Sequence, residues 1–180
     1  MTTRRLLLLL FAAAIAAAAP PLDVAIEKLT TFVNTYPKSA LRPEALYQLG
    51  ELLIRRADEQ FAAAQRAAAP SADAPDRPDY ASAIARYQEL IGAYPKFDRL
   101  DAAAYTLGTL LTVDQRYADA AKMFSIVTAR PASHFRPEAY FRLGDADFEL
   151  ATKARGTARR ALFVQAATAY DSATHTAPAG

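Results

Sequence analysis

The sequence contains no cysteine and no tryptophan, and it has only two histidines among its 180 residues. Without cysteine the chain can form no disulfide bond, and it has no thiol to carry a lipid anchor or to bind a metal. Neither His134 nor His175 has a second histidine or a cysteine at helical spacing, so both are interpreted as solvated loop residues. We therefore predict no metal site and no cofactor.

An excess of charge of one sign is also lacking. The chain has 21 basic and 19 acidic residues, and the two counts become equal once Arg4 and Arg5 are set aside. Proteins that bind nucleic acids usually carry a clear positive excess, because their basic side chains replace the counterions of the phosphates. Nucleic acid is therefore not an expected partner.

Residues 1–19 have the pattern of a secretory signal peptide. They open with the arginine pair, and residues 6–19 are uncharged and end in small side chains. This run is shorter than the about 20 residues that span a bilayer. Pro20 and Pro21 leave the cleavage point open, and an uncleaved anchor and a buried N-terminal helix are the alternatives. A signal peptide predicts export to the periplasm or cell envelope.

Composition and patterning favour an all-α fold for residues 20–180. Hydrophobic residues make up 52% of the chain, which has only six glycines, and alanine, the best helix former, dominates the apolar fraction. Runs in which Val, Ile or Thr alternate with polar residues, as half-buried strands require, do not occur. The chain is therefore expected to form one helical domain.

One sequence motif ends in Leu-Gly and occurs three times. Its copies are Arg42-Pro-Glu-Ala-Leu-Tyr-Gln-Leu-Gly50, Arg136-Pro-Glu-Ala-Tyr-Phe-Arg-Leu-Gly144 and, more loosely, Leu100-Asp-Ala-Ala-Ala-Tyr-Thr-Leu-Gly108. Each glycine follows a proline by thirteen residues, and these prolines are Pro37, Pro95 and Pro131. A glycine inside a helix costs about 1 kcal/mol relative to alanine, so its recurrence needs a reason. We expect a close approach of a neighbouring helix backbone at each glycine.

A second motif alternates with the first. An alanine is followed four residues later by a large side chain, and a proline follows the alanine by 11 or 12 residues. The copies are Ala25, Leu29 and Pro37; Ala83, Tyr87 and Pro95; Ala120, Phe124 and Pro131; and Ala166, Tyr170 and Pro178. Residues four apart share a helix face, so the alanine admits a neighbouring helix and the large side chain fills the groove beside it. The proline ends the helix.

The two motifs predict two types of helix that alternate along the chain. First-type helices, which carry the Leu-Gly motif, are predicted at 42–68, 98–114 and 136–154. Second-type helices, which carry the alanine motif, are predicted at 22–36, 79–94, 116–130 and 157–176. A proline-rich, extended loop is predicted at 69–79. Because the array starts on an unpaired second-type helix, either the N-terminal segment covers that helix or the chain is a piece of a longer protein.

In the middle unit Ala120, Phe124 and Pro131 follow Gly108 by 12, 16 and 23 residues, and this order resembles the tetratricopeptide repeat. The resemblance implies an α-solenoid of antiparallel helix pairs, with about three repeats and an extra N-terminal helix. The stretch Tyr-Pro-Lys-Ser-Ala-Leu-Arg-Pro-Glu-Ala at 36–45 is similar to the envelope subtype of the barrel-assembly lipoproteins and the Tol-Pal-associated periplasmic proteins. The chain also resembles repeat proteins of myxobacterial gliding motility.

Partner binding is predicted on the first-type helices, which in the tetratricopeptide family line the concave side. An aromatic residue stands three residues before each motif glycine, and further candidates follow the glycine. The predicted contact residues are Tyr47, Glu51, Arg55, Tyr105, Thr109, Phe141, Asp145 and Phe148. Aromatic anchors with a mainly acidic rim would favour a basic or amide-rich segment. The alternative is that the aromatic residues pack between neighbouring repeats as core.

Four basic residues between the last two predicted helices form a separate candidate surface. They are Lys153, Arg155, Arg159 and Arg160. A contact with a membrane surface or with peptidoglycan is one interpretation. The other is that basic residues near the end of a helix complement its dipole.

Catalytic and nucleotide-binding glycine motifs do not occur, and paired acids such as Asp145 and Glu149 are interpreted as a solvated helix face. We therefore predict a non-catalytic scaffold of the bacterial cell envelope. It would bind an extended or helical segment of another envelope protein, without a small-molecule substrate. A peptidoglycan- or glycan-binding module and an accessory repeat domain of a larger enzyme or motility machine are the alternatives.

Overall fold

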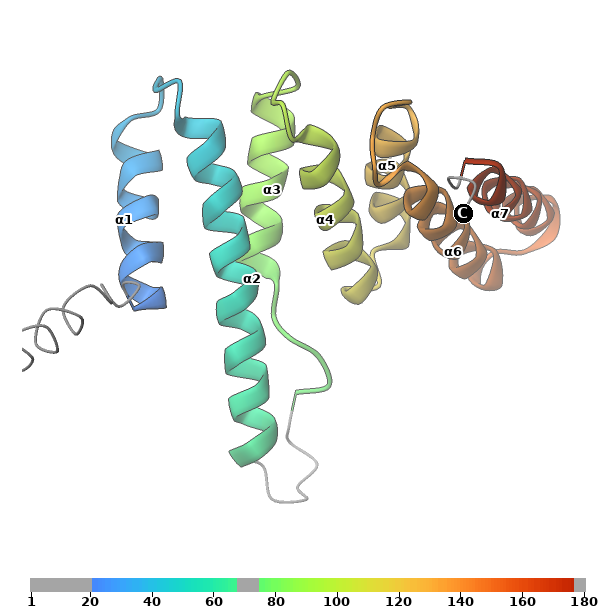
Figure 1. Cartoon of the computed structure of the whole chain (residues 1–180). Helices are drawn as coiled ribbons and strands as arrows, with labels where there is room; N and C mark the ends of the chain where they lie inside the picture. Colours follow the sequence, from blue (N-terminus) through green and yellow to red (C-terminus); the bar gives the residue numbers. More distant parts are fainter. Residues whose placement is uncertain (1–20, 68–74, 177–180) are drawn as a thin grey trace, which may run out of the picture.

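The computed structural model describes residues 21–67 and 75–176, and these residues form seven α-helices and no strand (Figure 1). The helices are α1 (Leu22–Thr35), α2 (Arg42–Ala67), α3 (Ala81–Ala93), α4 (Leu100–Val113), α5 (Tyr117–Thr128), α6 (Arg136–Lys153) and α7 (Gly156–Thr176). The predicted all-α fold class is confirmed for this part of the chain. The predicted signal peptide, residues 69–74 of the predicted loop and Pro178 lie outside the described residues.

The helices stand in a row in chain order, and from α1 to α6 the connections lie alternately at the top and at the bottom of the row (Figure 1). Substantial packing joins only helices that are neighbours in the sequence, as far as the described residues go. The second half of α2 projects beyond the row (Figure 1). None of the described helices combines the length and the apolar character needed to cross a membrane. Because each helix packs mainly against its chain neighbours, long helix faces are left at the surface.

Each predicted helix is present, and the predicted bounds differ from the observed ones by no more than two residues. The helix α3 begins at Ala81 rather than at 79, because Asp79 Oδ1 accepts a hydrogen bond from the Ala81 amide at 3.0 Å and holds the chain in a turn. The first three second-type helices end before their prolines, as predicted. Both α1 and α3 stop two residues before a proline, which are Pro37 and Pro95.

The three linkers that lead from a second-type to a first-type helix have the same backbone turns. In each linker two backbone hydrogen bonds recur. The amide of the second residue after the proline donates to the carbonyl of the residue before the proline. The amide of the fifth residue after the proline donates to the carbonyl of the second residue after the proline. The nitrogen–oxygen distances are 3.1 and 3.1 Å after Pro37, 3.0 and 3.0 Å after Pro95, and 3.1 and 3.2 Å after Pro131. Because the three linkers turn in the same way, residues that follow their prolines by the same number of positions occupy equivalent places in the fold.

Each first-type helix and the second-type helix after it form a hairpin: α2 with α3, α4 with α5, and α6 with α7. In each hairpin the motif glycine packs against an aromatic ring of the partner helix. The pairs are Gly50 with Tyr87, Gly108 with Phe124 and Gly144 with Tyr170, and a Cβ atom on each glycine would lie 2.7, 2.7 and 2.6 Å from the paired ring. The predicted close approach is confirmed, but the neighbour is a ring and not a backbone, so that part of the prediction was wrong.

The arginine that opens the Leu-Gly motif joins its helix to the preceding second-type helix. Arg42 Nε donates to the carbonyl of Val33 at 3.0 Å, and Arg136 Nε donates to the carbonyl of Thr128 at 3.1 Å. Both acceptors lie in the last turn of a helix, where carbonyl groups have no helical partner. Arg42 Nη1 also donates to the Tyr94 hydroxyl at 3.1 Å, so Arg42 joins α1, α2 and the end of α3. The sequence motif alone does not reveal this role.

Candidate partner-binding surface

The three aromatic residues that precede the motif glycines occupy different environments. Tyr47 is only 7% exposed and packs edge-on against Tyr87, with ring centroids 5.8 Å apart. The guanidinium of Arg99 also covers it, at 4.1 Å from the ring centroid. Tyr47 is therefore a core residue, which corrects its prediction as a partner contact. The physical reason is that the linker between α3 and α4 closes over its ring.

Tyr105 has the equivalent place on α4, and it is also covered by a linker side chain. Its ring packs against Phe124 at a centroid distance of 6.0 Å and stacks on Phe135 at 5.0 Å, with 22° between the ring planes. Tyr105 stays partly exposed, and Phe135 is 38% exposed. The accessible aromatic surface of this hairpin is therefore formed by Tyr105, which was predicted as a contact residue, and by Phe135, which was not.

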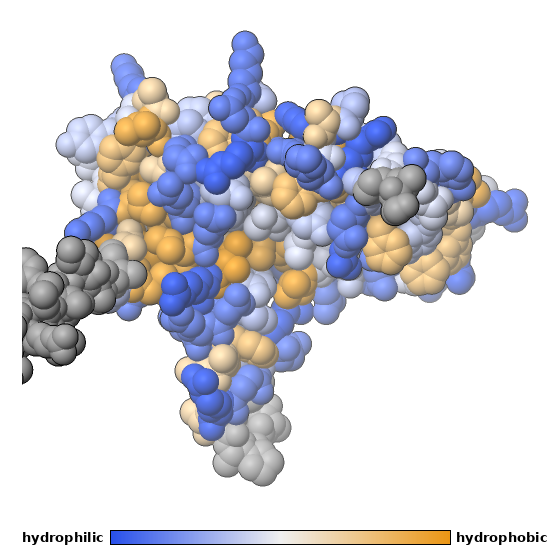
Figure 2. Space-filling view, viewed as in Figure 1, coloured by the Kyte–Doolittle hydropathy of each residue, from blue (hydrophilic) through white to orange (hydrophobic). Residues whose placement is uncertain are grey.

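Phe141 on α6 differs from the other two, because in the described part of the chain no linker side chain covers it. It is 45% exposed and packs against Tyr170, with ring centroids 5.5 Å apart. A hollow of about 610 Å³ adjoins the ring. Its lining residues are Pro137, Glu138, Phe141, Tyr170, Ala173 and Thr174. Figure 2 shows apolar surface over this α6–α7 end of the row, as well as over α1 and α2.

Phe148 is the second exposed ring on α6. It is 45% exposed and packs edge-on against Phe163 of α7, with ring centroids 5.5 Å apart. It follows Phe141 by seven residues, which is about two helical turns, so both rings lie on the same side of α6. Because a ring of α7 backs each of them, α6 presents two aromatic side chains in fixed positions.

Asp145 follows the third motif glycine and is held by Tyr170. The Tyr170 hydroxyl donates to Asp145 Oδ1 at 2.9 Å, and Arg142 Nη1 lies 3.6 Å from Asp145 Oδ2. Burial, together with the hydrogen bond to Asp145, raises the pKa of Tyr170 to about 12, so the hydroxyl keeps its proton at neutral pH. Asp145 is thereby fixed in one position next to the Tyr170 ring.

The remaining predicted contact residues lie at the surface of α2 and α4. Glu51, Arg55 and Thr109 are all exposed. Arg55 Nε lies 2.8 Å from Oε1 of Glu59, one turn further along α2. The Thr109 hydroxyl donates to the carbonyl of Tyr105 at 3.1 Å. Their accessibility agrees with a role in binding, which stays a prediction.

The four predicted basic residues are all exposed: Lys153, Arg155, Arg159 and Arg160. Lys153 ends α6, and its Nζ lies 4.5 Å from the ring centroid of Tyr117. Arg159 lies 5.5 Å from the ring centroid of Phe163 on α7. The helix-dipole interpretation accounts for Lys153, because a cation in the last turn of a helix faces the free carbonyl groups. Contact with a membrane surface or peptidoglycan stays a prediction.

Asp147 on α6 is a buried carboxylate that the sequence analysis did not single out. It is 9% exposed, and burial raises the pKa of its carboxyl group. It lines a second hollow, of about 490 Å³, together with Lys122 and Ser125 of α5 and Tyr140 of α6. Asp147 stands four residues after Leu143, on the face of α6 that adjoins this hollow. That spacing is the sequence signal that could have revealed it.

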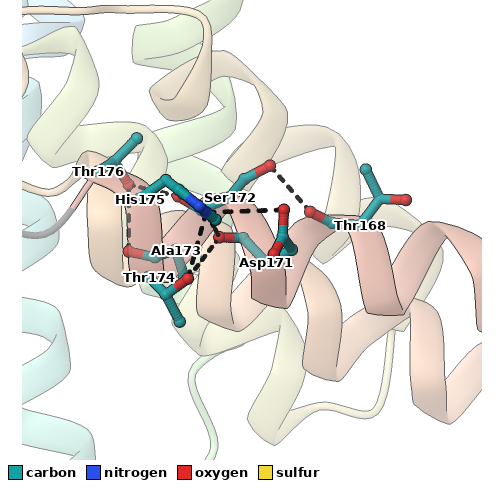
Figure 3. A network of polar contacts seen from close by, with 7 residues as sticks. All are labelled: Thr168, Asp171, Ser172, Ala173, Thr174, His175 and Thr176. Atoms are coloured by element: carbon teal, nitrogen blue, oxygen red, sulfur yellow. Dashed lines mark hydrogen bonds and ion pairs between the residues drawn. The ribbon is translucent and has the colours of Figure 1, made fainter.

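The last turns of α7 carry a cluster of hydroxyl groups beside His175 (Figure 3). The hydroxyls of Thr168, Ser172 and Thr176 donate to backbone carbonyls four residues earlier, at 2.8–2.9 Å. His175 Nδ1 lies 2.8 Å from the carbonyl oxygen of Asp171 and 3.6 Å from its Oδ2. His175 is therefore a helix residue and not a loop residue, which corrects its predicted position. It is exposed to solvent, as predicted.

Within the described residues no group of three or more His, Asp or Glu side chains is arranged to hold a metal ion. Neither the comparison with protein-family models nor the comparison with curated proteins gives a match. The function of the surface is therefore inferred from its geometry and charge.

Proposed function

We propose that this chain is a non-catalytic scaffold of the bacterial cell envelope, which binds a segment of a partner protein along the exposed side of its first-type helices. The observation that carries the proposal is the pair of exposed rings on α6, Phe141 and Phe148, each backed by a ring of α7. Aromatic side chains are frequent energetic centres of protein interfaces. Rings that are already held in place also lose little freedom when a partner binds.

The array belongs, in this proposal, to the tetratricopeptide type. Three features repeat in step with the sequence motifs: the contact between glycine and ring, the turns of the linkers, and the packing of each helix on its chain neighbours. Arrays of this kind stack similar units and use the extended surface that results to hold other proteins. The repetition therefore supports a binding role for the long exposed faces.

The charges on α6 favour a basic partner segment. Glu138, Asp145 and Glu149 stand within a few residues of the two exposed rings, and Arg142 is the basic residue among them. Arg142 is paired with both Glu138, at 3.0 Å, and Asp145, at 3.6 Å, so acidic groups predominate. An acidic rim around aromatic anchors attracts a basic segment and repels an acidic one.

The proposed location is the periplasm or another compartment of the cell envelope. It rests on the signal pattern of residues 1–19 and on the resemblance of residues 36–45 to envelope repeat proteins. The partners are, on this proposal, other envelope proteins that offer an extended or helical segment.

Affinity capture from an envelope extract tests the proposal, with the full chain as bait. The test variant is Phe141→Ala/Phe148→Ala. The control variant is Val24→Ala/Val164→Ala, which also removes two exposed apolar side chains, but from the second-type helices α1 and α7. We expect a protein captured by the wild type and by the control to be lost by the ring variant, while circular dichroism shows equal helix content. Equal capture by both variants, or no capture by the wild type, would contradict the proposal.

A further inference from the structure

The first hairpin shows how a linker side chain covers the ring three residues before the motif glycine. The guanidinium of Arg99, four residues after Pro95, lies 4.1 Å from the centroid of the Tyr47 ring. Arg99 also forms an ion pair with Glu44, which stands three residues before Tyr47. Glu44 Oε1 accepts a further hydrogen bond from Gln48 Nε2, at 2.8 Å. In this hairpin the Tyr47 ring and the Glu44 carboxylate therefore bind one planar cation between them.

In the second hairpin the same linker position carries a different side chain. Phe135, four residues after Pro131, stacks on Tyr105 with ring centroids 5.0 Å apart. The residue three before Tyr105 is Ala102, so no carboxylate stands there. In the first hairpin, Glu44 stands three residues before the ring and an arginine covers the ring, whereas in the second hairpin Ala102 has that position and an aromatic residue covers the ring.

The third hairpin has both the ring and the carboxylate, and among the described residues no linker side chain lies over the ring. Glu138 stands three residues before Phe141, and both side chains line the hollow of about 610 Å³. Phe141 is 45% exposed, whereas Tyr47 is 7% exposed. We propose that this hollow binds an arginine side chain of a partner protein, which stacks on Phe141 and pairs with Glu138. The inference rests on the proposed function, because it names the group that the partner presents.

The neighbouring side chains of the third hairpin are small enough to admit an arginine. Ala173 and Thr174 stand three and four residues after Tyr170. The equivalent residues of the first hairpin are the larger Leu90 and Ile91. The smaller pair leaves room beside the Phe141 ring for the aliphatic stem of an arginine, which packs on apolar surface while its guanidinium stays at the rim.

Arg142 is a basic residue of the chain itself that approaches this site. Its Nε lies 3.0 Å from Glu138 Oε1, but its guanidinium carbon is 5.9 Å from the centroid of the Phe141 ring. The corresponding distance of Arg99 from the Tyr47 ring is 4.1 Å. Arg142 therefore pairs with the carboxylate without stacking closely on the ring.

Arg142 stands two residues before its motif glycine, and Gln48 has the same place in the first hairpin. Gln48 and Arg99 both bond the Glu44 carboxylate at the same time. By the same geometry Glu138 can hold Arg142 and still accept an arginine from a partner.

A peptide probe tests the assignment. The probe is a synthetic peptide with the sequence of residues 95–113, in which Arg99 precedes the sequence of α4. Matched peptides carry Arg99→Phe or Arg99→Ala. Two-dimensional NMR of the isotope-labelled full chain maps the binding site of each peptide and gives its dissociation constant. We expect the arginine peptide to shift the signals of Glu138, Phe141 and Tyr170, and to bind about three- to tenfold more tightly than the alanine peptide.

A switch of specificity provides the sharper comparison. Glu138→Ala reproduces the arrangement of the second hairpin, where Ala102 goes with Phe135. This variant should prefer the phenylalanine peptide, whereas the wild type should prefer the arginine peptide. Glu149→Ala removes another acidic residue of α6 and, as the control, should leave the preference for arginine unchanged. All these side chains are at least partly exposed, so the variants should keep their fold, as checked by circular dichroism.

Three outcomes would overturn the assignment of this hollow. One is equal binding of the three peptides. Another is a set of NMR shifts confined to α2, α3 and α5, the helices that the linker and α4 contact in the intact chain. The third is a dimer of the full chain in sedimentation equilibrium that Phe141→Ala abolishes, because the occupant would then be a second copy. The proposed scaffold function stands or falls separately, on capture by the Phe141→Ala/Phe148→Ala variant.

Discussion

The ring of Tyr87 lies against the bare backbone of Gly50, so closely that a Cβ atom on the glycine would stand 2.7 Å from Cε2 of the tyrosine. Tyr87 is completely buried. Phe124 and Tyr170 make the same contact in the other two hairpins. Packing therefore requires glycine at an interior helix position, where it otherwise costs about 1 kcal/mol relative to alanine.

Gly108→Ala should destabilise the chain. The new methyl group would lie 2.7 Å from the completely buried ring of Phe124, and overpacking of this kind costs about 1–3 kcal/mol. Gly92→Ala is the control, because nothing lies within 4 Å of its Cβ position and alanine is the better helix former. Urea unfolding should show a lower free energy of unfolding for Gly108→Ala and a higher one for Gly92→Ala. A stabilised Gly108→Ala chain would refute the packing role of this glycine.

Tyr87→Phe should not destabilise the fold. The Tyr87 hydroxyl is buried and has no hydrogen-bond partner among the described residues, and the equivalent residue of the second hairpin is Phe124. Removing a buried polar group without a partner should leave the free energy of unfolding unchanged or raise it by up to about 2 kcal/mol. A loss of more than about 1 kcal/mol in urea unfolding would show that the hydroxyl does make a stabilising hydrogen bond.

Arg42→Ala should lower the free energy of unfolding by about 1–3 kcal/mol, because it removes hydrogen bonds to the Val33 carbonyl and to the Tyr94 hydroxyl that join three helices. Arg42→Lys should restore little of this stability, since an ammonium group lacks the planar fork that reaches both acceptors. Arg55→Ala is the control and should change stability little, because the Arg55 pair is exposed. Equal stability of the Arg42→Ala and Arg55→Ala chains would contradict this role.

Two carboxylates should respond to pH in opposite directions. Burial raises the pKa of Asp147, so its contribution to stability is greatest below the unfolded pKa and is lost as the pH rises through the folded pKa. The hydrogen bond from Arg99 lowers the pKa of Glu44, so its contribution is present above the unfolded pKa and is lost as the pH falls through the folded pKa.

Urea unfolding across a range of pH checks these signs. Asp147→Asn should raise the free energy of unfolding at about pH 7, and the gain should shrink toward about pH 3. Glu44→Gln should lower the free energy of unfolding slightly at about pH 7, and this loss should vanish in acid. The loss should be small because the ion pair is partly exposed. Effects of the same sign for both variants at neutral pH would be the opposite of this expectation.

The helices of this chain could be predicted from local signals. Pro37 and Pro95 end helices because a proline cannot continue one, and such local effects do not depend on the rest of the fold. The first residue of α3 was missed by two positions because the side chain of Asp79 forms a turn that competes with the helix. The recurring glycines also predicted a close contact with a neighbouring helix. The motif did not show that an aromatic ring makes this contact, because that is determined by how the two helices face each other.

The exposure of the aromatic residues could not be predicted in the same way. Tyr47, Tyr105 and Phe141 have the same place in the sequence motif, yet their burial differs. Their cover comes from side chains of the next linker, Arg99 and Phe135, which approach only when successive hairpins have packed together. The accessible part of the candidate site is thus a property of tertiary packing and not of the motif.

Site-specific photocrosslinking in cells that express the full chain tests most directly whether the first-type helices hold a partner. A photoreactive amino acid replaces Phe148 on α6 in one variant and Ser125, an exposed residue of the second-type helix α5, in the other. We predict that the probe at Phe148 gives a defined crosslinked protein and that the probe at Ser125 gives none. Crosslinks from Ser125 without crosslinks from Phe148, or none from either position, would contradict the proposed scaffold.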